Sequence, residues 1–407
     1  MSPWLRAQVG GLCCIAMLSG CATGAPYERD VAATHQALDA GQPDRARASL
    51  EALLADGRRD GPEGVLLRLE LAVVALHQGL PAVAAGALAQ ADPLLEVVDL
   101  TKDDAGEVAS WLFADAARPY RSPAWEKLLV NVLGMASRLA AGDRRGALVE
   151  ARRFDVVARF FGERSQDPGR VLGVGRLLAG VAHEAVGRDR AARLYLDEAR
   201  AALPALFTDG PDASGGELVV LVLAGRLPAK VAQPVDVDTA GLLAVQPGAA
   251  QNLRELGVKE VLLVGLAADR PLEDAAVAVA GLPVTVAWAD LAATARADFE
   301  RVRPQLARAA ITRALSRQTV RRTVASADGG GDERGGANLG HLLGGLLAGT
   351  MEAGDTPDTR AWSTLPARLG VARLALSPGT YDVAAGDHLV TVEVRAGRPT
   401  LALLVVD

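Results

Sequence analysis

Apolar side chains recur at helical spacing from Tyr27 to Leu203, and one pattern returns four times with a glycine at its origin. A small residue follows each glycine at +5, and packing residues follow at +9 and +12. The glycine is expected to end the first helix of a pair. The small residue at +5 lets the second helix approach the first closely, so the pattern predicts a pair of packed helices. The four sets are Gly41, Ala46, Leu50 and Leu53; Gly79, Ala84, Leu88 and Ala91; Gly142, Ala147, Ala151 and Phe154; and Gly187, Ala192, Leu196 and Ala199.

These offsets resemble the tetratricopeptide repeat, and they predict a helical-hairpin solenoid over residues 27–208. The four glycines are 38, 63 and 45 residues apart, against about 34 in a regular array, so the solenoid is expected to be irregular. An unrelated all-helical bundle would bury the same positions. Only the solenoid predicts a concave groove that could hold a peptide or a protein.

The pattern changes at residues 209–216, a Gly- and Asp-rich stretch that we take as a linker. Glu217 to Ala224 is an apolar, β-branched run between glycines, which is typical of a buried strand. Residues 217–325 are expected to form an α+β domain that ends in a long helix. Its further elements are strands over 235–245 and 258–266, one or two strands over 276–287 with an interruption at 281–283, a short helix over 249–256 and the long helix over 290–324.

Residues 326–337 read as a flexible loop, and residues 338–407 as a Gly-rich helix followed by alternating strands. Turns at Ser377-Pro378-Gly379 and at 395–397 separate these strands, so a β-meander is expected at the end of the chain. The expected fold class is α+β: an N-terminal tetratricopeptide-like helical-hairpin solenoid, a mixed α/β region and a small C-terminal β-meander.

The first 20 residues have the features of an export signal. Arg6 precedes a ten-residue apolar run, Val9 to Leu18, which is too short to remain as a membrane-spanning helix. The sequence Leu18-Ser19-Gly20-Cys21 resembles the lipobox of bacterial lipoproteins, which implies a signal peptide over 1–20, acylation of Cys21 and a lipid-anchored tether over 21–26. An ordinary secreted protein with a chance cysteine near its cleavage site is the alternative.

The same resemblance implies where the protein works. Ala22, in place of an aspartate after the cysteine, favours the inner leaflet of the outer membrane, with the chain facing the periplasm. The lipid bilayer is then the first partner, through acylated Cys21.

Charge and residue composition argue against several kinds of binding and catalysis. The net charge of -6 gives no nucleic-acid-binding signature, and the absence of cysteine after Cys21 excludes disulfides and thiol catalysis in the mature chain. The five histidines have no second histidine or cysteine at helical spacing, and no nucleophile motif occurs. We therefore expect no metal, no cofactor and no enzymatic activity.

Two stretches resemble a family of uncharacterised bacterial lipoproteins that contain tetratricopeptide repeats. The first runs from Trp125 to Arg153, with a W-E-K start, a Gly-Asp turn and a V-E-A-R-R helix. On that helix Glu150, Arg152 and Arg153 are polar positions that could face a partner in the groove, or that form a solvated helix face.

The second stretch is D-T-R-A-W-S-T-L-P, residues 358–366, and it matches the family's D-T-R-x-W-x-T-L-P motif. Asp358 and Arg360 could pair, and Trp362 would anchor the segment on a core. A structural latch and a binding site built on Asp358, Arg360 and Trp362 are both open at this point.

A third set of residues could face a membrane. Arg313, Arg317 and Arg321 stand four apart on one face of the long helix, and could contact lipid phosphates or an acidic partner. Gly340 and Gly344 give the following helix a flat face that suits either close helix packing or membrane contact. Each reading competes with an ordinary charged or packed helix face.

The expected function is a membrane-anchored periplasmic lipoprotein that acts as a protein–protein interaction scaffold, holding an envelope protein or peptide in the helical groove. An envelope enzyme that acts on cell-wall polymer at residues 355–366 is the alternative. A component of a secretion or transport complex is a third possibility.

Overall fold

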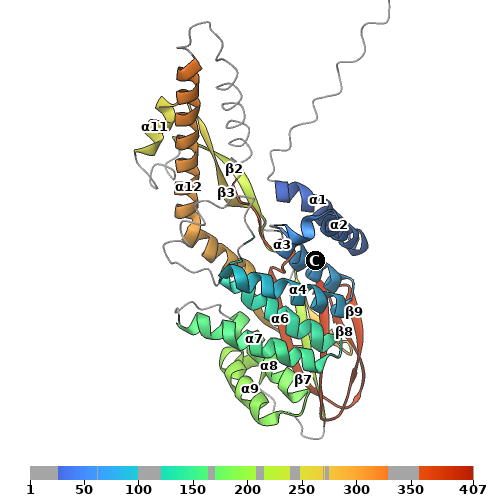
Figure 1. The fold of residues 1–407 in the computed structure, drawn as a ribbon. Coiled ribbons are helices and arrows are strands. Elements are labelled where there is room, and N and C mark those ends of the chain that lie inside the picture. The colour runs from blue at the N-terminus through green and yellow to red at the C-terminus, as the bar shows by residue number, and fades with distance from the viewer. Residues whose placement is uncertain are drawn as a thin grey trace, which may run out of the picture.

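The computed structural model describes residues 26–61, 63–99, 120, 122–163, 170–207, 215–238, 248–268, 270, 275–328 and 357–406. Over these ranges the fold combines helices and strands, so the α+β class is confirmed. Figure 1 shows two regions, a large body and an arm that projects from it.

The first half of the body is a layer of consecutive helical hairpins. Each hairpin turns at a predicted glycine, and Gly41, Gly79, Gly142 and Gly187 have left-handed φ angles of 63°, 67°, 77° and 75°, which favour glycine. The pairs are α1 (Pro26–Asp39) with α2 (Pro43–Ala55), α3 (Gly64–His77) with α4 (Pro81–Asp99), α6 (Ala124–Ala140) with α7 (Arg144–Glu163), and α8 (Arg170–Glu184) with α9 (Asp189–Ala202). Short 3-10 helices occur at Arg58–Asp60 and Pro204–Leu206.

Small residues allow these helices to pack closely. The alanine at +5 of every hairpin is fully buried, as the spacing predicts. Between hairpins, a Cβ atom on Gly175 of α8 would lie 2.1 Å from Cε2 of Phe154 on α7. Any larger residue at 175 would therefore push these two helices apart.

Two sheets form the rest of the body. The first has the strand order β10-β1-β7-β6, in which β1 pairs parallel with β10 and antiparallel with β7. The second has the order β5-β4-β8-β9. Their bounds are β1 (Gly216–Ala224), β6 (Ala287–Asp290), β7 (Arg368–Leu376) and β10 (Pro399–Val406) for the first sheet, and β4 (Val277–Val279), β5 (Leu282–Pro283), β8 (Gly379–Ala385) and β9 (His388–Val394) for the second.

The first sheet is the middle of three layers. Val219, Leu221 and Leu223 on one face of β1 share a core with the helices. The alternating residues Leu218 and Val220 share a second core with strands β4, β8 and β9. Helices therefore cover one face of the central sheet and the second sheet covers the other.

The predicted C-terminal β-meander is wrong, because the strands pair in a different order. The four predicted strands exist as β7 to β10, but among them only β8 and β9 pair with each other. Strand β1 is apolar on both faces, so it takes the centre of a sheet and recruits β7 and β10 as its neighbours. Residues 209–216 thus separate two segments of the chain that share one core.

The arm consists of β2 (Lys230–Asp236), α11 (Ala249–Glu255), β3 (Glu260–Leu266) and the long helix α12 (Leu291–Asp328). Strands β2 and β3 form a separate antiparallel pair. Among the described residues, the arm has its own small core of Val237, Leu253, Val261, Ala310 and Ile311. Helix α12 begins in the body, where Leu291 belongs to the main core, and then runs outward (Figure 1).

None of the helices in the described ranges is both long enough and apolar enough to cross a bilayer.

Candidate functional site

The D-T-R-A-W-S-T-L-P motif lies in residues 357–366, which we call the docked segment because it packs on the helical layer. Trp362 is 1% exposed and belongs to the main core, together with Leu365. The amide of Leu227 donates to the carbonyl of Leu365 at 2.8 Å, which ties the segment to the strand layer. The segment then continues into β7.

Asp358 and Arg360 bind each other. The backbone N–H and Nε of Arg360 donate to Oδ1 of Asp358 at 3.1 and 2.8 Å, and Nη2 donates to Oδ2 at 2.8 Å. Arg360 is 4% exposed, so this pairing supplies the counter-charge that a buried guanidinium requires. The main-chain bond makes the pair a local brace for the turn.

Glu70 of α3 holds the next part of the segment. It is 1% exposed and lies in a mainly apolar helix that also contains Arg68. Its Oε1 accepts from the Ser363 backbone N–H at 2.9 Å and from Tyr27 Oη at 3.0 Å, while Oε2 accepts from the Thr364 N–H at 2.9 Å. A carboxylate that binds two successive amides fixes the position of the main chain.

Ser363 joins Glu70 to His35 of α1. The Ser363 hydroxyl donates to Glu70 Oε1 at 2.7 Å and lies 2.7 Å from His35 Nε2. Because a hydroxyl has one proton to donate, His35 is the donor in the second bond and carries its proton on Nε2. Burial lowers the pKa of His35, which favours this neutral form.

Glu126 of α6 is a second buried carboxyl beside the segment. Tyr120 Oη and Ser122 Oγ both donate to its Oε2, at 2.6 and 3.2 Å. Burial raises the pKa of Glu126 to about 7, despite these bonds and the nearby Lys230. Lys230 in turn donates to the Arg360 carbonyl at 3.4 Å, so the base of the arm also contacts the docked segment.

A cavity of about 40 Å³ lies where the arm meets the body. It has room for water, but it is much smaller than the roughly 300–1,000 Å³ of typical ligand pockets. Its lining includes Trp125, Glu126, Lys230, Asp298, Phe299 and Trp362.

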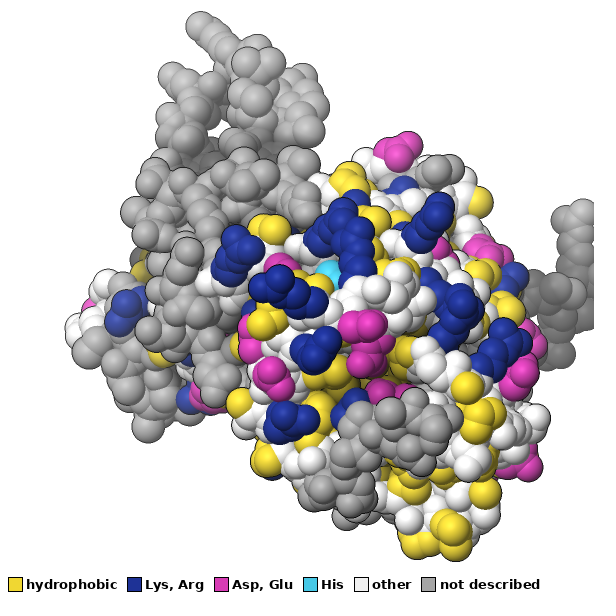
Figure 2. All heavy atoms as spheres, turned by 90° about the horizontal axis from the view of Figure 1, so that it is seen from below, with side chains coloured by type: hydrophobic (Ala, Val, Ile, Leu, Met, Phe, Trp, Pro, Cys, Tyr) yellow, Lys and Arg dark blue, Asp and Glu magenta, His cyan; other side chains and the backbone are white. Residues whose placement is uncertain are grey.

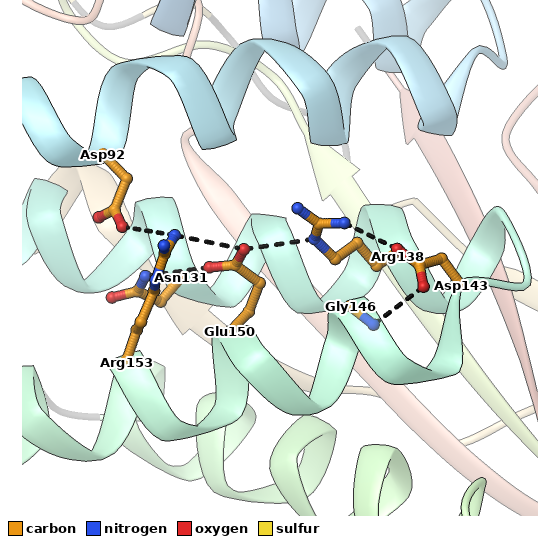
Figure 3. Close-up of polar contacts among 7 residues, drawn as sticks. All are labelled: Asp92, Asn131, Arg138, Asp143, Gly146, Glu150 and Arg153. Carbon is orange, nitrogen blue, oxygen red and sulfur yellow. Dashed lines mark hydrogen bonds and ion pairs between the residues drawn. The ribbon is translucent and has the colours of Figure 1, made fainter.

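The three groove candidates of α7 lie in different environments. Glu150 is buried against α6, where Asn131 Nδ2 and Arg138 Nε donate to its carboxylate at 3.4 and 3.3 Å (Figure 3). Arg153 pairs with Asp92 of α4 at 2.9 Å. Arg152 is exposed on the opposite side of the helix. Glu150 and Arg153 therefore join helices to one another, and the three residues do not converge on one site.

Only some of the other predicted site residues lie within the described part of the chain. Asp358, Arg360 and Trp362 have the contacts described above. Arg313 lies on α12 and is half-buried, whereas the side chains of Arg317 and Arg321 lie outside the described residues. The same holds for Cys21, Gly340 and Gly344.

Sequence reasoning missed Glu70 and Glu126, which organise the site. A signal was present, because each acid lies in a mainly apolar stretch with one basic residue close by: L-L-R-L-E-L-A-V-V for Glu70 and A-W-E-K-L-L-V for Glu126. A buried carboxylate needs partners, so such an acid marks a place where another segment docks.

The helices that line the predicted groove face the chain's own second half. Helices α3, α6 and α8 share the main core with β1 and β10, and Glu70 binds the docked segment. Within the described residues, no group of three or more His, Cys, Asp or Glu side chains is arranged to hold a metal ion. The arrangement can therefore recognise an extended main chain, and the chain it recognises is its own.

Comparisons of the chain with models of protein families, with curated proteins and with solved structures find no match.

Proposed function

We propose that the protein is a lipid-anchored scaffold of the cell envelope, attached through Cys21 to the outer membrane and facing the periplasm. We also infer that its four hairpins are degenerate tetratricopeptide-like repeats. The left-handed turn glycines and the buried alanine at +5 in each hairpin support this inference.

The observation that carries the proposal is the contrast between a filled groove and a projecting arm. The inner helices are covered by the central sheet and the docked segment, so we place the partner site outside the groove. The arm projects from the body on α12, a helix of 38 residues and therefore about 57 Å long. A rigid anchored body with a long projection suits a protein that holds a partner away from the membrane.

Two measurements test the anchor and the arm separately. Mass spectrometry of Cys21 in the protein purified from cells is expected to show the acyl groups of a mature lipoprotein. An unmodified Cys21 would remove the anchor from the proposal.

For the arm, a photo-crosslinking amino acid replaces exposed Arg254 or Arg303, and exposed Thr380 on the second sheet serves as the control. We expect discrete adducts in cells from the two arm positions and none from Thr380. Equal labelling at all three positions, or none from the arm, would contradict the proposal.

A second candidate, an envelope enzyme at the docked segment, is favoured by one contact. Ser363 Oγ lies 2.7 Å from His35 Nε2, as in a nucleophile–base pair. The bond runs from histidine to serine, however, because the serine proton is held by Glu70. Ser363→Ala separates the two functions: an enzyme loses its turnover of cell-wall substrate, whereas a scaffold keeps the arm adducts.

A further inference from the structure

One face of α7 carries arginine and valine in alternation. Arg145, Val149, Arg152, Val156 and Arg159 follow one another at spacings of 4, 3, 4 and 3, which keeps them on one side of a helix. All five are exposed, and Val149 and Val156 are 45% and 70% exposed. The row spans 14 residues, or about 21 Å.

The neighbouring helix extends this surface. On α9, Arg190, Arg193 and Leu194 are exposed, as are the acidic residues Asp189, Asp197 and Glu198. Leu194 is 65% exposed. The hydroxyl of Tyr195 on α9 donates to Asp155 on α7, which joins the two helices. We call the exposed residues of α7 and α9 together the outer helical face.

The described acidic side chains of α7 are paired with arginines of other helices. Glu150 is buried against Arg138, and Asp155 binds Arg176 at 2.5 Å. Arg145, Arg152 and Arg159 thus keep their charge unneutralised by their own helix. Figure 2 views the molecule from the end where α8 and α9 lie, and shows Lys and Arg side chains spread over this side, with hydrophobic and some acidic side chains between them. The positive charge is concentrated on the α7 row, since the exposed arginines and exposed acids of α9 balance each other. It contrasts with the net charge of -6 for the whole chain.

We propose that the outer helical face lies on the surface of an anionic phospholipid bilayer. The inference rests on the lipid anchor of the proposed function, because Cys21 stands only five residues before α1, the first helix of the same layer. An extended tether of that length reaches about 17 Å, so the start of α1 must stay within about that distance of the lipid. Guanidinium groups bind lipid phosphates, and the exposed Val and Leu side chains enter the headgroup region.

An acidic protein has the same charge complementarity, but a bilayer accounts for two further features. The arginines lie in a row along a helix surface and not around a pocket, which suits a ligand that is itself a plane. Exposed aliphatic side chains separate the charges, as on helices that lie in a membrane interface.

Vesicle binding by the unacylated mature chain, residues 22–407, tests the proposal without the anchor. The probe is a vesicle of phosphatidylcholine with 30% phosphatidylglycerol, compared with phosphatidylcholine alone. The test variant combines Arg145→Gln, Arg152→Gln and Arg159→Gln. The control combines Arg254→Gln, Arg301→Gln and Arg395→Gln, which removes the same charge from exposed positions on the arm and the second sheet.

We expect the chain to bind the anionic vesicles, to bind more weakly as salt rises and not to bind the neutral ones. The test variant should lose roughly 100-fold in affinity, at about fivefold for each arginine near the surface, while the control binds like the parent chain. Equal loss in both variants, equal binding of parent and test variant, or no binding by the parent chain would overturn the proposal. A parent chain that does not bind vesicles would overturn this proposal without bearing on the acylation of Cys21. The failure of this proposal and the failure of the lipid anchor can therefore be distinguished.

Discussion

The body and the arm bury their residues in different ways. In the body, strand β1 is buried on both faces and joins a helical core on one side to a sheet core on the other. In the arm, two strands and two helices share a described core of five residues, which is separate from both. Stability scales with buried apolar surface, so the body is expected to unfold as one unit and the arm to open at a lower free energy.

The body and the arm are also held together by different kinds of contact. The body is closed by polar contacts between residues far apart in sequence, such as Glu70 with Thr364, whereas the arm is closed mainly by neighbours such as β2 with β3. Changes in the docked segment should therefore affect the whole body. Changes in the arm should remain local.

The largest effect is expected at Trp362. Trp362→Ala removes the largest fully buried side chain of the docked segment and should lower the free energy of unfolding by about 4 kcal/mol. Urea unfolding followed by circular dichroism measures the change. Leu389→Ala, at a residue that is 67% exposed, is the control and should change stability by less than about 0.5 kcal/mol. If both variants were equally stable, the docked segment would not hold the body together.

A somewhat smaller effect is expected at Glu126, and it depends on pH. The folded protein keeps the carboxyl protonated up to about pH 7, whereas its ordinary pKa is 4.5. The folded state therefore binds more protons, and the wild type loses up to about 3 kcal/mol of unfolding free energy as the pH rises from about 4.5 to 7.

Glu126→Gln has no such titration, so its stability relative to the wild type should rise over the same pH range and then level off. Unfolding curves at several pH values measure this. Glu51→Gln, at an exposed position of α2, is the control for removing one carboxylate and should change stability by less than about 0.5 kcal/mol. A difference that stays constant with pH would show that Glu126 is ionised in the folded body.

The smallest effect is expected when the same substitution, valine to alanine, is made once in the body and once in the arm. Val371→Ala in β7 and Val261→Ala in β3 each remove two buried carbons, at about 2 kcal/mol. Hydrogen exchange should become about 30-fold faster throughout the body for Val371→Ala. For Val261→Ala it should become faster only in β2, β3 and α11. Faster exchange in both regions for either variant would mean that body and arm unfold together.

The local elements of both regions could be predicted from the sequence. Helical spacing and the turn glycines located the hairpins, and apolar runs located β1 and β3, because these signals are local. The long helix was also predicted, with α12 starting at Leu291. The start of β2 at Lys230 was missed, since its alternation is interrupted by Gln233 and Pro234.

Strand pairing and the site could be predicted only in part. Alternation shows which face of a strand is buried but does not show which strand lies beside it, so β7 to β10 were assigned to a meander. Asp358 and Arg360 were foreseen as a pair, because they are two residues apart. The bonds of Glu70 to Ser363 and Thr364 join residues 293 and 294 positions apart, and no spacing rule predicts such a contact.

The central claim is that the described helices of the helical layer form no free groove, because their inner face is part of the body's core. Expression of the helical layer alone, residues 21–208, tests this most directly. Without the sheet and the docked segment, α3 and α6 would expose apolar side chains and Glu70 would lose its amide partners. We expect a chain with no cooperative thermal transition by circular dichroism and with a tendency to aggregate. A soluble monomer that unfolds cooperatively would show that the helices fold with an open groove, and would contradict the account.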